Sequence, residues 1–151
     1  MILPFAIDVK DIPILIVGAG CVGMRKIKTL YRAGASLTVV DPVVRVPEWF
    51  TGVWEELEYN PSFLKDKVLV FACTDNPDIN ALICKQAYKK GILSCNVSDS
   101  RYRTLSSMGY FIHDSVMVAT LAINSSVKQS IKIKERLNDC IKKFPSSEGW
   151  A

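Results

Sequence analysis

The sequence lacks several features that would assign the protein to a particular class. None of its hydrophobic runs approaches the roughly 20 apolar residues of a membrane-spanning helix, so we expect no membrane span. The five cysteines form no CxxC pair, and the single histidine, His113, has no spaced partner. We therefore expect no metal site, and we place His113 in a turn or hairpin. The sequence also has no internal repeat and no low-complexity segment.

An excess of charge of one sign is almost lacking as well. The chain has 151 residues, with 19 Lys and Arg against 15 Asp and Glu. This mild basic excess suits an anionic ligand and does not indicate a nucleic-acid partner. Several cysteines lie in apolar runs as small hydrophobes, which predicts a reduced, cytoplasmic protein without disulfides. The opening "MILPFAID" has no basic flank and is interrupted by Pro4 and Asp8, so we expect no signal peptide.

What the chain does contain is an alternation of strands and helices. Ile14 to Val17 is a run of branched apolar residues, typical of a parallel strand that is covered on both faces. Further strands are predicted at 36–42, 67–75 and 92–97, with a weaker edge strand at 54–59. Helices are predicted at 22–33 and from Pro77 to Gly91, the second with Asn76 as N-cap. The expected apolar face of this second helix holds Ile79, Leu82, Ile83 and Ala87. The alternation predicts an α/β fold with a doubly wound parallel sheet.

A glycine-rich turn follows the first buried strand. Gly18, Gly20 and Gly23 fit the pattern G-x-G-x-x-G between a strand and a helix, which is typical of a Rossmann-type dinucleotide-binding fold. Gly18 would permit the tight turn, Gly20 the approach of a pyrophosphate, and Gly23 the close packing of the helix on the sheet. The N-terminus of that helix would offer free N–H groups to the phosphates.

An acidic residue strengthens this interpretation. Asp41 ends the second strand, where a carboxylate can accept hydrogen bonds from the hydroxyl groups of the adenosine ribose. The same carboxylate would repel the 2′-phosphate of NADP, so we expect NAD as the cofactor. The alternative is that Asp41 only begins a turn with Pro42.

The composition changes after residue 100. We expect residues 1–100 to form the NAD-binding domain and residues 101–151 to form a small dimerisation and substrate-side segment of two strands and one helix. The two strands are predicted around His113 and Asp114, and an amphipathic helix at 127–143 after a cap at Asn124 or Ser125. The expected apolar face of this helix holds Ile133, Leu137, Cys140, Ile141 and Phe144. Because one small sheet would not cover this apolar area, we expect a homodimer built through this part.

Two segments resemble one known family. They are "MILPFAIDVKDIPILIVGAGCVGMRKIKTLYRAGASLTVV", which includes the pair Arg25-Lys26, and "VLVFACTDNPDINALICKQAYKKGILSCNVSD". The chain resembles the precorrin-2 dehydrogenase and sirohydrochlorin ferrochelatase family, the dehydrogenase module of siroheme synthases. The resemblance implies NAD-dependent oxidation of precorrin-2, an anionic tetrapyrrole, to sirohydrochlorin. A ferrochelatase activity is the weaker part of that implication.

The resemblance also implies roles for individual residues. Asp99 matches the aspartate that the family uses as acid or base, and its alternative role is to cap a turn before Ser100. The cofactor site would include Cys21 and Val22 over the pyrophosphate, Pro42 and Val43 beside the adenosine, and Thr74 and Asp75 in the cleft. A basic face of the last helix, with Arg101 and Arg103, would attract the carboxylates of the substrate, although such faces are more often simply solvated.

Two departures leave other interpretations open. The stretch "TLAINSSVKQ" stands where the family has a Ser-x-Gly-Gly-x-Ser-Pro segment, and the chain lacks the further helical domain of typical members. Either the chain has been cut, or it is a short form whose substrate side comes from a dimer partner or is lost. A non-catalytic NAD-binding sensor or scaffold would fit these departures. A nucleotide-sensing domain of a potassium transport system fits less well, because the span from Asp41 to Val68 is short.

Overall fold

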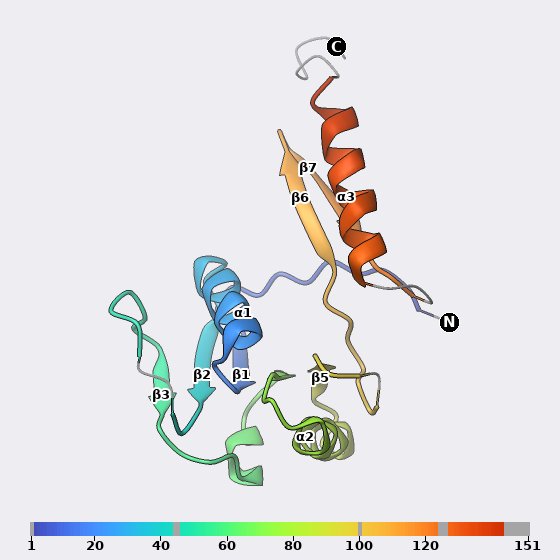
Figure 1. The fold of residues 1–151 in the computed structure, drawn as a ribbon. Helices are drawn as coiled ribbons and strands as arrows, with labels where there is room; N and C mark the ends of the chain where they lie inside the picture. Colours follow the sequence, from blue (N-terminus) through green and yellow to red (C-terminus); the bar gives the residue numbers. More distant parts are fainter. Residues whose placement is uncertain (1, 44–45, 100, 124–126, 144–151) are drawn as a thin grey trace. The chain divides into compact units, whose positions relative to one another are not determined.

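The computed structural model describes residues 2–43, 46–99, 101–123 and 127–143 (Figure 1). The chain divides into two compact units, Met1–Leu105 and Ser106–Ala151. The first unit carries the parallel sheet, and the second carries a strand hairpin and a helix. Within the described residues, none of the helices combines the length and the apolar character that crossing a membrane requires.

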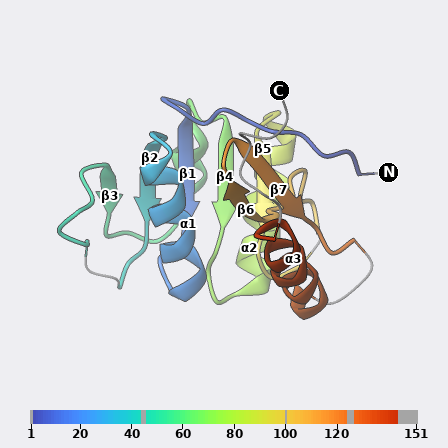
Figure 2. The same ribbon diagram turned by 90° about the horizontal axis from the view of Figure 1, so that it is seen from above.

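Five parallel strands form the sheet of the first unit. They are β1 (Pro13–Val17), β2 (Ser36–Val40), β3 (Val53–Glu55), β4 (Leu69–Ala72) and β5 (Leu93–Asn96). Their order across the sheet is β3-β2-β1-β4-β5, which Figure 2 shows from above. The chain runs from β1 outward to β2 and β3, then returns to the other side of β1 for β4 and β5. Two halves that diverge from a central strand define the Rossmann-type topology.

Helices cover both faces of this sheet, as the apolar runs predict. Side chains alternate along β1, so that Ile14 and Ile16 join one buried cluster and Leu15 and Val17 join the other. Helix α1 (Cys21–Arg32) contributes Ile27 and Leu30 to the first cluster. Helix α2 (Pro77–Lys89) contributes Ile83, Cys84 and Ala87 to the second. The doubly wound α/β fold predicted from the sequence is confirmed.

The detailed pattern of α2 differs from the prediction. Its N-cap is Asn76, as expected, with Oδ1 accepting the N–H groups of Asp78 at 2.9 Å and Ile79 at 3.2 Å. However, Ile79 and Leu82 are 40% and 48% exposed, whereas the polar Asn80 is fully buried. The prediction that Ile79 and Leu82 belong to the buried face is therefore wrong. The apolar pattern did not predict that the Asn80 amide would be buried and would form hydrogen bonds to the loops beside the start of α2.

The second unit is built from β6 (Gly109–His113), β7 (Val116–Thr120) and α3 (Val127–Ile141). The strands form an antiparallel hairpin in which Phe111 pairs with Val118 and His113 with Val116. His113 thus lies at the turn end of β6, as predicted.

The side of α3 that is buried also differs from the prediction. The half-buried side chains of the helix include Lys134, Asn138 and Ile141, whereas Ile133 and Leu137 are 47% and 38% exposed. The predicted cap at Asn124 or Ser125 and the predicted apolar residue Phe144 lie outside the described residues. The expected apolar face of α3 is therefore in large part exposed in the single chain.

Candidate functional site

The residues singled out in the sequence of the first unit come together at one edge of its sheet. Because β1, β2, β4 and β5 are parallel, the loops that follow them leave from the same side. The loop after β1 carries the glycines, and the sheet order reverses direction beside that strand. The expected site residues at this edge are Gly18, Gly20, Cys21, Val22, Gly23, Asp41, Pro42, Val43, Thr74, Asp75 and Asp99. Ligands bind in open α/β sheets at such a switch point.

Gly18 makes the tight turn out of β1. Its φ of +92° lies in the region that side chains disfavour. A Cβ atom at this position would also lie 2.6 Å from the carbonyl carbon of Cys73 and 2.7 Å from the backbone nitrogen of Thr74. The loops after β1 and β4 therefore touch through their backbones, and only glycine fits between them.

The other two glycines have different environments. A Cβ on Gly23 would collide with the carbonyl group of Gly18, so the first turn of α1 packs directly on the glycine turn. A Cβ on Gly20 would meet none of the described atoms within 4 Å. Gly20 is also the N-cap of α1 and makes no side-chain capping bond, and the first turn of α1 has no acidic residue. Open space beside uncapped helix N–H groups fits the pyrophosphate of a dinucleotide.

Asp41 is tied to the glycine turn. Its Oδ2 accepts the backbone N–H of Ala19 at 2.6 Å, and its Oδ1 accepts the N–H of Val43 at 2.9 Å. The residue is only 8% exposed, whereas Pro42 and Val43 beside it are exposed. Asp41 thus both begins a turn after β2 and holds the loop after β1.

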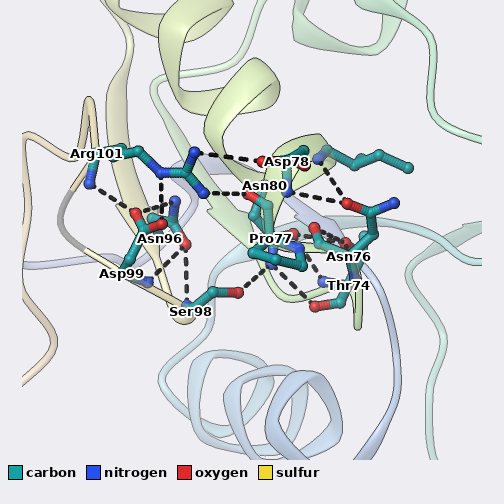
Figure 3. Close-up of polar contacts among 10 residues, drawn as sticks. Thr74, Asn76, Pro77, Asp78, Asn80, Asn96, Ser98, Asp99 and Arg101 are labelled. Carbon is teal, nitrogen blue, oxygen red and sulfur yellow. Dashed lines mark hydrogen bonds and ion pairs between the residues drawn. The ribbon is translucent and has the colours of Figure 1, made fainter.

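A buried amide joins the loop after β4 to the loop after β5. Oδ1 of Asn80 accepts the backbone N–H of Thr74 at 3.0 Å and the Thr74 hydroxyl at 2.7 Å. Nδ2 of Asn80 donates to the carbonyl of Thr74 at 2.9 Å and to the hydroxyl of Ser98 at 2.6 Å (Figure 3). Asn80 therefore fixes both the predicted cofactor loop and the residue that precedes Asp99. Asp75, next along the first of these loops, is exposed.

A second buried amide shapes the approach to Asp99. Asn96 is the last residue of β5, and its Oδ1 accepts the N–H groups of Ser98 at 2.9 Å and Asp99 at 3.3 Å. Its Nδ2 donates to Oδ1 of Asp99 at 3.1 Å. One side chain thus turns the backbone and contacts the carboxylate that follows. The turn-capping alternative for Asp99 is partly realised as well, because its Oδ1 accepts the N–H of Arg101.

Arg101 is the strongest polar partner of Asp99. Its Nε lies 2.6 Å from Oδ2 of Asp99, and its backbone N–H donates to Oδ1 at 2.7 Å (Figure 3). The hydrogen bonds and the charge of Arg101 hold the pKa of the Asp99 carboxyl below its usual value, and the charge of Arg103 acts in the same direction. Asp99 is therefore an ionised carboxylate at neutral pH. An ionised carboxylate can take up a proton and cannot deliver one.

The sequence did not predict the structural role of two members of this arrangement. Asn80 was visible as an amide in the second helix, but its neighbours Ile79 and Leu82 dominated the apolar pattern. Arg101 was visible only as a possible attractor of substrate carboxylates, because its spacing from Asp99 does not indicate a hydrogen bond. Among the described residues, no group of three His, Cys, Asp or Glu side chains is placed to hold a metal ion.

The sheet order, the glycine turn and the uncapped start of α1 define a dinucleotide-binding domain of the Rossmann type. Residues 5–107 match the family model NAD_binding_7, whose description reads "Putative NAD(P)-binding". The chain belongs to this NAD(P)-binding family, so a nicotinamide dinucleotide is the cofactor class.

Individual relatives agree with the resemblance seen in the sequence. Siroheme synthase 2 of Aeromonas salmonicida is 33% identical over 92% of this chain and 30% of its own length. Siroheme synthase 1 of the same organism is 36% identical over 85% of this chain and 28% of its own length. The predicted resemblance to siroheme synthases is thus confirmed. The chain spans about 30% of the length of the curated relatives it matches.

A solved structure shares the fold. The structure titled "SirC, precorrin-2 dehydrogenase" superimposes with a TM-score of 0.78 and 20% sequence identity, covering 92% of this chain and 71% of that chain. This similarity confirms the Rossmann-type architecture.

Proposed function

We propose that the chain oxidises precorrin-2 to sirohydrochlorin with NAD as the cofactor, and that Asp99 is its acid–base residue. The observation that carries the proposal is the convergence of the glycine turn and the ionised Asp99 at one sheet edge. The substrate is inferred from the siroheme synthases to which the chain is similar and from the name of the precorrin-2 dehydrogenase that shares its fold. The proposal covers the oxidation and does not extend to metal insertion.

The cofactor would be held by residues of three loops. Backbone N–H groups from Gly20 to Gly23 would bind the pyrophosphate, with Cys21 and Val22 beside it. The Asp41 carboxylate would accept a ribose hydroxyl, with Pro42 and Val43 beside the adenosine. Thr74 and Asp75 would line the nicotinamide side. When bound, the nicotinamide supplies a hydride acceptor.

The preference for NAD over NADP follows from the position of Asp41. A buried carboxylate beside the ribose repels a 2′-phosphate, and like charges in contact disfavour binding. We expect NADH to bind at least roughly tenfold more tightly than NADPH, which corresponds to about 1.4 kcal/mol. Titration of the protein with each reduced cofactor, followed by its fluorescence, measures this ratio. Equal affinities would contradict the preference.

The role of Asp99 follows from its charge. Removing a hydride from a reduced tetrapyrrole leaves a proton to be removed as well. Asp99 is ionised at neutral pH and is held in place by Arg101, so it can accept that proton. A positioned general base contributes typically about 10²- to 10⁴-fold to a rate.

The test is anaerobic incubation of the chain with NAD and enzymatically prepared precorrin-2, with NADH formation and the tetrapyrrole spectrum as readouts. Asp99→Asn keeps the shape of the side chain and removes the base, so turnover should fall by about 10²-fold or more. Asp66→Asn is a matched control, because exposed Asp66 lies before β4, away from the carboxyl edge of the sheet. We expect Asp66→Asn to retain the activity of the unmodified chain.

The alternatives predict other outcomes. Dinucleotide binding without turnover would favour the non-catalytic sensor or scaffold, and full activity in Asp99→Asn would remove Asp99 from the reaction. In the first case the affinity for NAD should still fall when the glycine turn is altered. In the second case the base must be sought elsewhere in the chain.

We further propose that the second unit forms a homodimer. In the hairpin, Ile112, Val116 and Met117 are 60%, 62% and 59% exposed, and α3 leaves Ile131 and Ile133 44% and 47% exposed. Large exposed apolar patches mark protein–protein interfaces, so we expect a second copy to cover this surface. The chain mass is 16.8 kDa, and light scattering should give about twice that value. A particle of the monomer mass at every concentration would contradict the dimer.

A further inference from the structure

Arg101 links two carboxylates that belong to different elements of the first unit. On one side its Nε lies 2.6 Å from Oδ2 of Asp99, in the loop after β5. On the other side its NH1 lies 3.3 Å from Oδ1 of Asp78, in the first turn of α2. Its NH2 also donates to the carbonyl of Pro77 at 3.4 Å (Figure 3). The planar guanidinium therefore connects the loop after β5, which carries Asp99, to the first turn of α2.

This position is not one that the helix itself would favour. The N-terminus of α2 carries the positive end of the helix dipole, where a cation is disfavoured and a carboxylate is favoured. Asp78 and the Pro77 carbonyl offset that cost at the start of α2. The Nε of the same guanidinium donates its hydrogen bond to Asp99. A network of two carboxylates and one guanidinium is more ordered than an isolated surface pair, which contributes little.

The donors around Asp99 are unequally distributed. Oδ1 accepts two hydrogen bonds, from the backbone N–H of Arg101 and from Nδ2 of Asn96. Among the described residues, Oδ2 accepts one, from Nε of Arg101. A carboxylate oxygen has about two lone pairs, so Oδ1 is filled and Oδ2 keeps one for a further partner. Oδ2 is thus the atom equipped to receive a proton.

We propose that Arg101 is a positioning residue, which holds the Asp99 carboxylate in a fixed orientation against the first turn of α2, with Oδ2 as the proton-accepting atom. The role in the reaction rests on the proposed function, because it takes Asp99 as the base. The fixed orientation of Asp99 does not depend on the reaction. It follows from the two bonds that Arg101 donates to Asp99 and the two that it donates to α2.

The geometry requires arginine and not only a positive charge. The guanidinium presents donors along a rigid plane, so Nε, NH1 and NH2 reach three acceptors at once. A lysine ammonium is a compact charge on a flexible stem and cannot span both carboxylates in the same way. Arg101→Lys should therefore keep Asp99 ionised but restore only part of its orientation.

The experiment compares Arg101→Met and Arg101→Lys in the anaerobic dehydrogenase assay. Arg101→Met should lower kcat by about 10- to 100-fold, the range expected when a reacting group is misplaced by about 1 Å, and leave the KM for NAD unchanged. Arg101→Lys should recover part of that loss. Arg32→Met, the same substitution in the last turn of α1, is the matched control and should retain the kcat of the unmodified chain.

The pH profile separates this role from a merely structural one. The groups of its own loop whose charge acts on Asp99 are Arg101 and Arg103, both of which lower its pKa. From α2, Asp78 lies on the other side of Arg101, and the buried thiol of Cys84, whose pKa is raised chiefly by burial and also by the charge of Asp99, faces the loop. Loss of Arg101 raises the pKa of Asp99, so the acid limb of kcat/KM should move to higher pH in Arg101→Met. Destabilisation of the fold would lower activity at every pH without moving the limb. A limb that stays in place, or a kcat within twofold of the unmodified chain, would overturn the proposal.

A second measurement does not depend on turnover. In protein labelled with ¹³C at the aspartate carboxyls, the Asp99 signal is assigned by its loss in Asp99→Asn. Its titration midpoint should be higher in Arg101→Met than in the unmodified chain and in Arg32→Met. Equal midpoints in Arg101→Met and the unmodified chain would contradict the proposed interaction of Arg101 with Asp99. If the unmodified chain does not oxidise precorrin-2 but the midpoint shifts, the proposed function fails while the hold on Asp99 stands.

Discussion

The carboxylate of Asp41 accepts the backbone N–H of Ala19, 22 residues earlier in the chain, at 2.6 Å. Ala19 is the residue between the first two glycines of the turn, and β1 and β2 lie side by side. The acid at the end of β2 thus helps to shape the turn at the end of β1. It combines a structural role that the structure shows with the ribose contact that we propose.

The first prediction concerns this contact. Asp41→Ala leaves the N–H of Ala19 without its partner, and a hydrogen bond to a charged group contributes about 1.5–3 kcal/mol. The free energy of unfolding should fall by about that amount, and the affinity for NADH should fall as well. Asp41→Asn keeps an acceptor oxygen and should lose less stability. Urea unfolding and cofactor titration of both variants measure the two effects, and an unchanged stability in Asp41→Ala would contradict the structural role.

The glycines of the turn should respond differently to a methyl group. Gly23→Ala places Cβ against the Gly18 carbonyl and should destabilise the fold, because that backbone cannot move aside easily. Gly20→Ala meets no described atom and should unfold at nearly the same urea concentration. It should nevertheless lose dinucleotide affinity, since its methyl group would occupy the space left for the pyrophosphate. If Gly20→Ala binds NADH as tightly as the unmodified chain, the pyrophosphate lies elsewhere.

Asn80 should be sensitive even to an isosteric change. Asn80→Asp keeps the oxygen that accepts from Thr74 but removes the Nδ2 donor to the Thr74 carbonyl and to Ser98. A buried polar group left without its partner costs about 1–3 kcal/mol, so the free energy of unfolding should fall by about that much. Leu82→Asn, on an exposed position of the same helix, is the control and should change stability by less than about 0.5 kcal/mol. Thermal and urea unfolding at neutral pH measure the stability of both variants. An equal loss in Asn80→Asp and Leu82→Asn would contradict the role of Asn80.

The cysteines should differ in reactivity. Cys21 and Cys140 are exposed, whereas Cys73, Cys84 and Cys95 are buried. Because the thiolate is the reactive form and needs access, the first two should react with iodoacetamide well before the buried three. Cys21 lies in the glycine turn, so NAD should slow its alkylation and leave that of Cys140 unchanged. Mass spectrometry of the labelled peptides gives both rates, and equal protection of the two residues would argue against a cofactor at the turn.

The buried thiol of Cys73 predicts a change of stability with pH. Burial raises its pKa from 9.0 to about 12. A raised pKa in the folded state means that this contribution to stability is complete below about 9 and is lost as the pH rises toward 12. The free energy of unfolding should therefore decline between pH 9 and 12, and the decline should be shallower in Cys73→Ala. Equal slopes in the two proteins would contradict the assignment to Cys73.

The sequence predicted most of the first unit because its signals are local. Apolar runs such as Ile14 to Val17, rich in branched residues, favour strands that are covered on both faces, and Gly18 marks the turn after this one. The burial of Asn80 and the exposure of Ile79 and Leu82 could not be predicted in this way. They depend on which loops lie beside the helix, and the partners Thr74 and Ser98 are 6 and 18 residues away.

The same reasoning explains the outcome at the candidate site. The glycines and Asp41 have the spacing that is typical of dinucleotide-binding sites, so the sequence alone could single them out. The link from Asp99 through Arg101 to Asp78 has no such pattern, because it joins residues 21 apart where the loop after β5 approaches the start of α2. For α3, amphipathic spacing gave the helix but not the side on which its neighbour packs.

The bonds from α2 to both loops give the two loops a shared anchor. Asn80 holds Thr74 and Ser98, and Asp78 at the start of the same helix receives Arg101. In the reaction that we propose, the loop beside the nicotinamide and the loop that carries the base would therefore be attached to one helix. A substitution that loosens the start of α2 would then disturb cofactor binding and proton transfer together.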